Sequence, residues 1–265
     1  MKRLIPLAVF PLVQVAAFVG AGVTYAEFPW IAAGLLAVSV LSLDLTVHIF
    51  LHECIHALHW ERVPWPGAFA LTAIGGLPFD GYRLHHYNHH RHDNGPEDFS
   101  TTWSWDGSGG RRPRNLLAYM ILWPGELARA RRAIQIQAAA GEIPPGLQSR
   151  LRLQKIFLAV LLLTLALVSW PWALGYAVMV YGGWALVSLH NYGQHLPIEG
   201  GGPVTSVPGR AYNALLFNNG LHVEHHANPA VPWHAITPDP ASQRTAAPHL
   251  VAPLLPGATR GRVSA

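Results

Sequence analysis

Four long apolar runs constrain this chain more than any other feature of its sequence. They cover roughly residues 4–26, 30–50, 156–170 and 172–189. An α-helix needs about 20 apolar residues to cross the hydrocarbon core of a bilayer. Charged residues make up only 12% of the chain, which is about half the share of a typical soluble domain. The sequence therefore predicts an integral membrane protein with four transmembrane helices and otherwise helical structure.

Two further segments have apolar character without the length of a clean span. The run at 66–82 is interrupted by Pro66, Gly67, Gly75, Gly76 and Pro78, which favours a re-entrant or interfacial segment. The stretch 116–136 mixes apolar and basic residues, and it predicts an interfacial amphipathic helix kinked at Pro124. We expect the Pro-rich and Ala-rich tail after Pro229 to be irregular, and residues 1–265 to form one membrane-embedded domain.

The basic residues predict how the chain is oriented. The connections between runs one and two and between runs three and four contain no Lys or Arg. The positive-inside rule then places both termini and the large middle segment in the cytoplasm. The first run has about 20 residues, longer than the 7–15 of a signal-peptide core, so we expect it to be retained. The net charge of +4 is explained by this orientation and not by nucleic-acid binding.

Histidines dominate the polar part of the sequence. The chain has 16 histidines, and most of them fall in four groups. The groups are His48, His52, His56 and His59; His85, His86, His89, His90 and His92; His190 and His195; and His222, His225 and His226. The predicted topology places all four groups on the cytoplasmic side of the membrane. A cytoplasmic helical cap that holds a histidine-rich site follows from this placement.

The spacing within the groups predicts metal binding. His48, His52 and His56 recur every four residues, so they should share one face of a helix. The pattern His-x-x-His-His occurs at 86–90 and again at 222–226. In each, the first and last members share a helix face, and the adjacent pair can reach two metals. Imidazole suits Fe, Zn, Cu and Ni, and two metals would use about ten such ligands.

Two other interpretations of these histidines remain open. The segment His52–Glu53–Cys54–Ile55–His56 matches the HExxH motif of zinc metalloproteases, in which Glu53 would be the general base. This interpretation leaves the other three groups unexplained. A non-enzymatic metal transporter or sensor is the second alternative. We would expect polar residues to line several of its transmembrane helices, and the apolar runs of this chain do not show them.

The histidine motifs resemble those of a known family. HECIH, HHYNHH and HVEHH look like the three histidine boxes of the membrane fatty acid desaturase superfamily, which includes desaturases, hydroxylases and carotenoid ketolases. The segment NNGLHVEHHANPAVPW resembles the last box with its Pro-Trp, and HHRHDNGPEDF resembles the second. The resemblance extends from about His48 to Trp233. It implies four transmembrane helices under a cytoplasmic cap, with a di-iron site between them.

The resemblance also implies which residues bind iron. Matched by position, the ligands would be His52, His56, His86, His89, His90, His195, His222, His225 and His226. Asn191 would hold a water on one metal. His85 and His190 are alternates. His48, His59 and His92 are additional to the family pattern; they could orient the ligands, or His48 or His59 could replace one of the two ligands of the first box.

The chemistry implied by the resemblance is O2-dependent oxidation of an unactivated C–H bond. Desaturation of a long apolar lipid or fatty acyl chain is the leading interpretation, and hydroxylation or carotenoid ketolation is the alternative. The electrons would come from an external donor such as a ferredoxin, attracted by the basic cytoplasmic surface.

Acidic residues near the histidines are candidates for orienting them. Asp44 lies inside the second apolar run, where an ionisable group is costly and usually has a partner. We expect it to accept a ring N–H from His48 or His52. Further candidates of this kind are Glu53, Asp93, Glu97, Asp98 and Glu224.

Overall fold

The computed structural model describes residues 4–245 and 247–258. The chain divides into two compact units, each built from segments that are far apart in the sequence. Unit 1 comprises Met1–Leu84 and Arg131–Trp184, and unit 2 comprises His85–Ala130 and Ala185–Ala265.

Four helices are long and apolar enough to cross a membrane. They are Pro6–Thr24, Pro29–Ala57, Pro145–Val168 and Trp170–Gln194. The first contains the 3-10 turn η2 (Pro6–Ala8) and α1 (Val9–Thr24); the second contains α2 (Pro29–Leu45), the π turn η3 (Thr46–Leu51) and α3 (His52–Ala57); the others are α8 (Pro145–Val168) and α9 (Trp170–Gln194). These helices confirm the predicted number of candidate spans and indicate a membrane protein.

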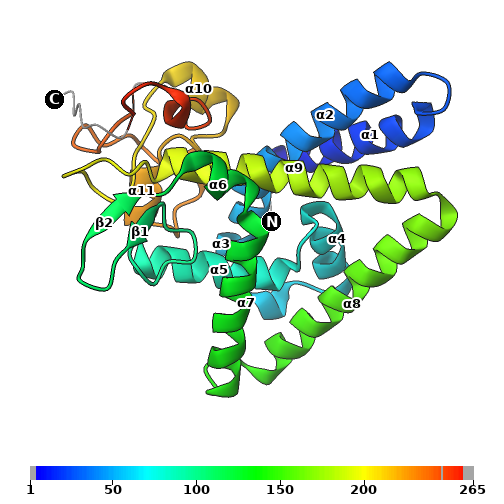
Figure 1. Ribbon diagram of the computed structural model, residues 1–265, viewed down its shortest axis with the longest axis horizontal. Coiled ribbons are helices and arrows are strands. Elements are labelled where there is room, and N and C mark those ends of the chain that lie inside the picture. Colours follow the sequence, from blue (N-terminus) through cyan, green and yellow to red (C-terminus); the bar gives the residue numbers. More distant parts are fainter. Residues whose placement is uncertain (1–3, 246, 259–265) are drawn as a thin grey trace. The chain divides into compact units, whose positions relative to one another are not determined.

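Within unit 1, α1 and α2 lie side by side as a hairpin (Figure 1). Large apolar side chains on the four long helices are exposed, among them Leu167 and Val168 at 78% and 80%. A soluble protein rarely exposes extended apolar surface. These helices therefore have the outer surface that a lipid environment requires.

The broken apolar segment forms two helices, α4 (Trp65–Gly75) and α5 (Phe79–His92). The last carbonyls of α4 accept hydrogen bonds from side chains of α1 and α9. Gln14 Nε2 donates to Ile74 O at 2.8 Å, Tyr176 Oη to Ala73 O at 2.7 Å, and Trp184 Nε1 to Gly75 O at 2.8 Å. Backbone groups without water need such internal partners. These three donors explain how a helix can end inside an apolar environment.

Gly76 terminates α4 and provides the first test of this fold. Its φ is +69°, and a Cβ at this position would collide with the side chain of Val180. We expect Gly76→Ala to lower the free energy of unfolding by about 1–3 kcal/mol, because alanine resists this backbone angle. Denaturant unfolding in detergent would measure the change.

Gly34→Ala is the matched control, because Gly34 lies within α2 with nothing near its would-be Cβ. The control should be neutral or slightly stabilising. Equal stability of Gly76→Ala and the parent would contradict the assigned role of Gly76.

A buried polar network connects the start of α5 with α8. Asp80 Oδ2 accepts from Arg150 Nε at 3.0 Å and from Gln154 Nε2 at 2.6 Å, and Asp80 N donates to Gln154 Oε1 at 3.0 Å. Arg83 Nη1 donates to the carbonyls of Ile55 and Leu58 at 3.0 and 2.7 Å. The network explains why α8 begins at Pro145, earlier than hydropathy predicts: its polar first turns are satisfied inside the protein.

The described part of unit 2 contains short elements joined by long loops. The strands β1 (Trp103–Trp105) and β2 (Arg111–Pro113) form an antiparallel hairpin, with Trp103 opposite Pro113. The short helical elements that follow include α6 (Leu116–Ile121), α10 (Arg210–Leu215), α11 (His222–Ala227) and the 3-10 turn η5 (Trp233–Ala235). The hairpin was not predicted from the sequence, because its strands have only three residues each.

The single kinked helix predicted at 116–136 is wrong in one respect. The structure has two helices, α6 and α7 (Trp123–Ala139), separated at Leu122. Pro124 lies in the first turn of α7, where a missing N–H costs nothing and the fixed φ suits the helix. The proline therefore starts a helix and does not bend one. The tail after Pro229 is mainly irregular, as predicted, with 3-10 turns at η5 and η6 (Ala252–Leu254).

Candidate metal centre

The C-terminal half of α5 carries the second histidine box, and the turn that follows shapes its surroundings. Asp93 and Asn94 have positive φ angles of 41° and 63°, which end the helix at His92. Asn94 Oδ1 accepts from the backbone N of Thr102 at 2.7 Å, and Asn94 N donates to Asp98 Oδ2 at 2.8 Å. This turn folds the chain back, so that the Asp98 carboxylate reaches His89.

Seven histidines of unit 2 form two groups of converging ring nitrogens. Cluster 1 consists of His86, His90 and His225, and cluster 2 consists of His89, His195, His222 and His226. Within each cluster the candidate ligand nitrogens lie within 4.8 Å of one another. In cluster 1, His90 Nε2 is 3.0 Å from His86 Nε2 and 3.1 Å from His225 Nε2. In cluster 2, the Nε2 atoms of His195 and His222 are 3.1 Å apart.

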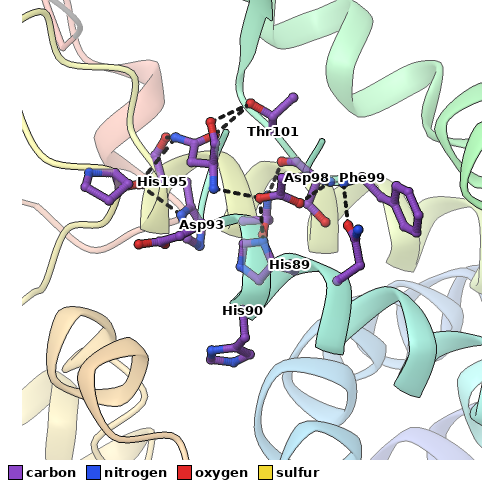
Figure 2. A network of polar contacts seen from close by, with 12 residues as sticks. His89, His90, Asp93, Asp98, Phe99, Thr101 and His195 are labelled. Atoms are coloured by element: carbon purple, nitrogen blue, oxygen red, sulfur yellow. Dashed lines mark hydrogen bonds and ion pairs between the residues drawn. The ribbon is translucent and has the colours of Figure 1, made fainter. Parts of the chain in front are cut away.

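Adjacent histidines of one box belong to different clusters. His89 is in cluster 2 and His90 in cluster 1, and the same division separates His226 from His225. Figure 2 shows the His89 ring turned toward Asp98 and the His90 ring pointing the other way. The i, i+4 partners stay together, with His86 beside His90 and His222 beside His226. The division leaves two separate groups of imidazoles, each of which could hold a metal ion.

The outer ring nitrogens of cluster 2 have oxygen partners. His89 Nδ1 is 2.8 Å from Asp98 Oδ2, His226 Nδ1 is 3.0 Å from Asp93 Oδ1, and His195 Nδ1 is 3.0 Å from Pro203 O. A carbonyl or carboxylate can only accept, so the Nδ1 atoms of His89 and His195 donate. That tautomer leaves the lone pair on Nε2, and metal-binding histidines are oriented in this way.

Protonation in cluster 2 follows from burial and charge. Burial lowers the pKa of His195 and His222, with the neighbouring rings of His89 and His226 acting in the same direction. These two imidazoles are therefore neutral and able to bind a metal. Burial raises the pKa of Asp98, but the interactions with the His89 ring and the hydrogen bond from Ser100 N outweigh it and hold the carboxyl pKa below its usual value. Asp98 is therefore a permanent acceptor for the His89 ring.

The donor set of both clusters fits metal ions. His90 Nε2 lies within hydrogen-bond distance of two other ring nitrogens, yet one ring nitrogen carries only one proton or one lone pair. A cation that accepts the lone pairs of all three ring nitrogens would satisfy them together. Ligands at right angles on bonds of about 2.1 Å would lie about 3 Å apart, which agrees with the observed separations.

In unit 1, α3 holds the first box. The rings of His52 and His56 are 4.8 Å apart, and His52 is buried. The π turn η3 precedes them, and His48 Nε2 lies 3.6 Å from Asp44 Oδ1. The structure groups His48 with Asp44 and apart from His52 and His56. The predicted common face is thus correct only for His52 and His56, because π turns change the angular step between residues.

The sequence model of the fatty acid desaturase family matches residues 28–238. The chain belongs to the fatty acid desaturase family. A comparison with curated proteins found no match. Members of this family typically bind two irons through histidine motifs, and membership makes this chain an enzyme of the desaturase and hydroxylase type.

Asn191 of this desaturase-family chain lies in α9. Its Nδ2 donates to Tyr119 Oη at 2.8 Å and to Ser100 O at 3.2 Å. Tyr119 Oη in turn donates to Ser100 O at 2.7 Å. These contacts fix the amide plane of Asn191, while its carbonyl oxygen is the atom that could accept from a water.

Several other residues that the sequence singled out lie outside the two clusters. His85 Nε2 is 3.3 Å from Ser100 Oγ, and burial lowers the pKa of its ring to about 4 despite the charge of Asp98. His92 lies 3.2 Å from Glu97, and His59 lies 3.6 Å from Glu61 at an exposed position. Glu224 accepts from Ser206 Oγ at 2.6 Å, so its contact supports a loop and not a histidine ring.

Other contacts of the desaturase site were missed at the sequence level. Thr102 Oγ1 donates to the carbonyl of His195 at 2.6 Å, and the Trp233 ring packs at a tilt against the His225 ring, with 4.3 Å between the ring centroids. His249 is fully buried beside the end of α9. Only the Pro-Trp after the third box carried a signal for any of these, because Thr102 and His249 have no motif around them.

Proposed function

We propose that this protein is an O2-dependent di-iron enzyme that desaturates a long apolar lipid or fatty acyl chain. The observation that carries the proposal is the division of adjacent histidines between cluster 1 and cluster 2. One metal needs only three or four ligands, whereas two separate imidazole clusters suit two irons. The nine proposed ligands are the seven histidines of the clusters together with His52 and His56.

Two irons, when bound, would supply the activation of O2 for C–H oxidation. In desaturation the substrate loses two hydrogens, and O2 takes these with two electrons and two protons to give two waters. The electrons come from an external one-electron donor such as a ferredoxin. Family membership and the four apolar helices support a membrane lipid as the substrate.

The residues of this chain orient the ligands. Asp98 and the carbonyl of Pro203 each accept from one ring of cluster 2, and the Asp93 carboxylate lies 3.0 Å from the His226 ring. The Asp44 carboxylate faces His48 at 3.6 Å, and we propose that it steers that ring. We propose that Asn191 holds a water beside one metal, which is consistent with the fixed plane of its amide. Both termini and the metal site are proposed to face the cytoplasm, where a basic surface attracts the donor.

The intramembrane protease alternative has weaker support. A zinc protease would use His52, His56 and one further ligand, with Glu53 as base. It would leave cluster 2 without a function, although four buried or half-buried imidazoles converge there. A protease would lose activity on replacement of Glu53 and would contain no iron.

The first experiment compares the metal content of purified protein with that of His89→Ala, after anaerobic loading with Fe(II). We expect about two irons per chain in the parent, and fewer in His89→Ala, because cluster 2 loses one of its ligands. His234→Ala is the control, since His234 is exposed and lies in neither cluster. One zinc and no iron would overturn the proposal.

Product analysis with the iron-loaded enzyme then identifies the reaction. Loss of two hydrogen atoms from the lipid would support desaturation. Gain of one oxygen atom would indicate hydroxylation, and gain of oxygen with loss of two hydrogens would indicate ketolation.

A further inference from the structure

A segment beyond the family match packs against the loop that supports cluster 2. The match ends at residue 238. The chain after this residue packs alongside the loop formed by residues 202–206. Ser206 N donates to Gln243 O at 2.8 Å, and Thr245 N donates to Ser206 O at 2.9 Å. Ser206 and Arg244 form an isolated parallel bridge. The tail is therefore held to this loop by regular backbone hydrogen bonds.

His249 makes the deepest contact of the tail. Its side chain is fully buried, and its Nε2 lies 3.1 Å from the carbonyl oxygen of Thr205. Because a carbonyl only accepts, this nitrogen carries the proton and donates. A Cβ at position 193 would collide with the backbone carbonyl of His249. The tail and the end of α9 can thus approach this closely only because residue 193 is glycine.

The loop contacted by His249 holds the end of α9 in place. Thr205 Oγ1 donates to Gly193 O at 2.8 Å, and Thr205 N donates to Gln194 O at 2.8 Å. Two residues earlier, Pro203 O accepts from His195 Nδ1 at 3.0 Å. The loop therefore sets both the position of His195 and the direction of its ring.

The same loop also holds the start of α11. Ser206 Oγ accepts from Val223 N at 2.9 Å and donates to Glu224 Oε2 at 2.6 Å. These residues directly follow His222, the first histidine of α11. The ring of His249 lies 6.4 Å from that of His222, so it stands behind cluster 2, with Nε2 committed to Thr205.

We propose that His249 is a positioning residue for cluster 2. Its hydrogen bond to Thr205 fixes the loop 202–206, and the loop in turn fixes His195 and His222. The part of the proposal that concerns iron rests on the proposed function, whereas the ordering of the loop does not. His249 lies outside the family match, so a segment that the family model does not cover helps to position histidines that it does cover.

The test uses two substitutions of the full chain in detergent. His249→Phe keeps a buried ring and removes the donor, and His249→Gln keeps a donor. Hydrogen–deuterium exchange of peptides covering 193–206 is measured in iron-free protein. We expect exchange to be about tenfold faster in His249→Phe, because a tenfold change corresponds to the net free energy of one hydrogen bond. Exchange in His249→Gln should be close to that of the parent. His234→Ala, at an exposed position, should match the parent.

Anaerobic titration with Fe(II) is the second measurement. His249→Phe should bind iron at cluster 2 about 10–100-fold more weakly than the parent, while iron binding at cluster 1 is unaffected. Unchanged exchange in His249→Phe would overturn the positioning role, and so would equal acceleration in both variants, because ring packing would then be responsible. A parent that binds no iron would overturn the proposed function, and the exchange result would still decide the role of His249.

Discussion

Asp98→Asn is expected to lower the affinity of cluster 2 for iron by about 10–100-fold, the usual effect of removing the partner of a metal-binding histidine. Asp98 Oδ2 accepts from His89 Nδ1 and from Asn94 N, both at 2.8 Å, and Oδ1 accepts from Ser100 N at 2.7 Å. The substitution replaces one carboxylate oxygen with an NH2 group, which is a donor and would face another N–H donor. The His89 ring would lose its orientation and its lone-pair direction.

Fe(II) titration under anaerobic conditions would measure this effect. The control is Glu97→Gln, which neutralises the neighbouring carboxylate, whose side chain is 76% exposed and contacts His92. The control should bind both irons as the parent does. Parent-like affinity in Asp98→Asn would show that His89 does not depend on this carboxylate, and cluster 2 would then need another source of order.

Asp80→Ala is expected to lower the free energy of unfolding by about 3–5 kcal/mol, the cost of removing one partner from a buried ion pair. Asp80 is fully buried, with Arg150 Nε at 3.0 Å and Arg83 Nε at 3.6 Å. Without the carboxylate, two buried guanidinium groups would lack this counter-charge. The loss of stability would extend to the end of α3, because Arg83 also donates to the carbonyls of Ile55 and Leu58.

Unfolding in detergent, followed by circular dichroism, would measure the loss of stability. Glu61→Ala is the matched control, since Glu61 is an acidic residue of the same unit with a side chain that is 66% exposed. Its effect should fall within about 0.5 kcal/mol. Comparable stability of the two variants would contradict the assigned role of the Asp80 network.

The transmembrane pattern was predictable because hydropathy is a local property. The four candidate spans coincide with the four apolar runs, apart from their ends. The errors occur where tertiary contacts satisfy polar residues, as for Gln154 in the early turns of α8. A hydropathy profile excludes such residues, since it cannot detect that Asp80 lies opposite them.

The candidate histidines were recognisable for a similar reason. An i, i+4 spacing places His86 beside His90 and His222 beside His226 whatever the rest of the chain does. The oxygen partners of these rings were only partly predictable. Asp93 and Asp98 lie close to the second box in sequence, whereas Pro203 has no side-chain signal at all.

Four apolar helices, three histidine boxes and the divergence of adjacent histidines within a box can all be predicted from the sequence. Each of these follows from composition and from the helical period. Which histidines from different boxes share a cluster depends on the tertiary fold, because His90 and His225 are 135 residues apart in the sequence. The fold also places His249 behind His222. Such pairings depend on how turns and loops return the chain, as the left-handed residues Asp93 and Asn94 do after α5.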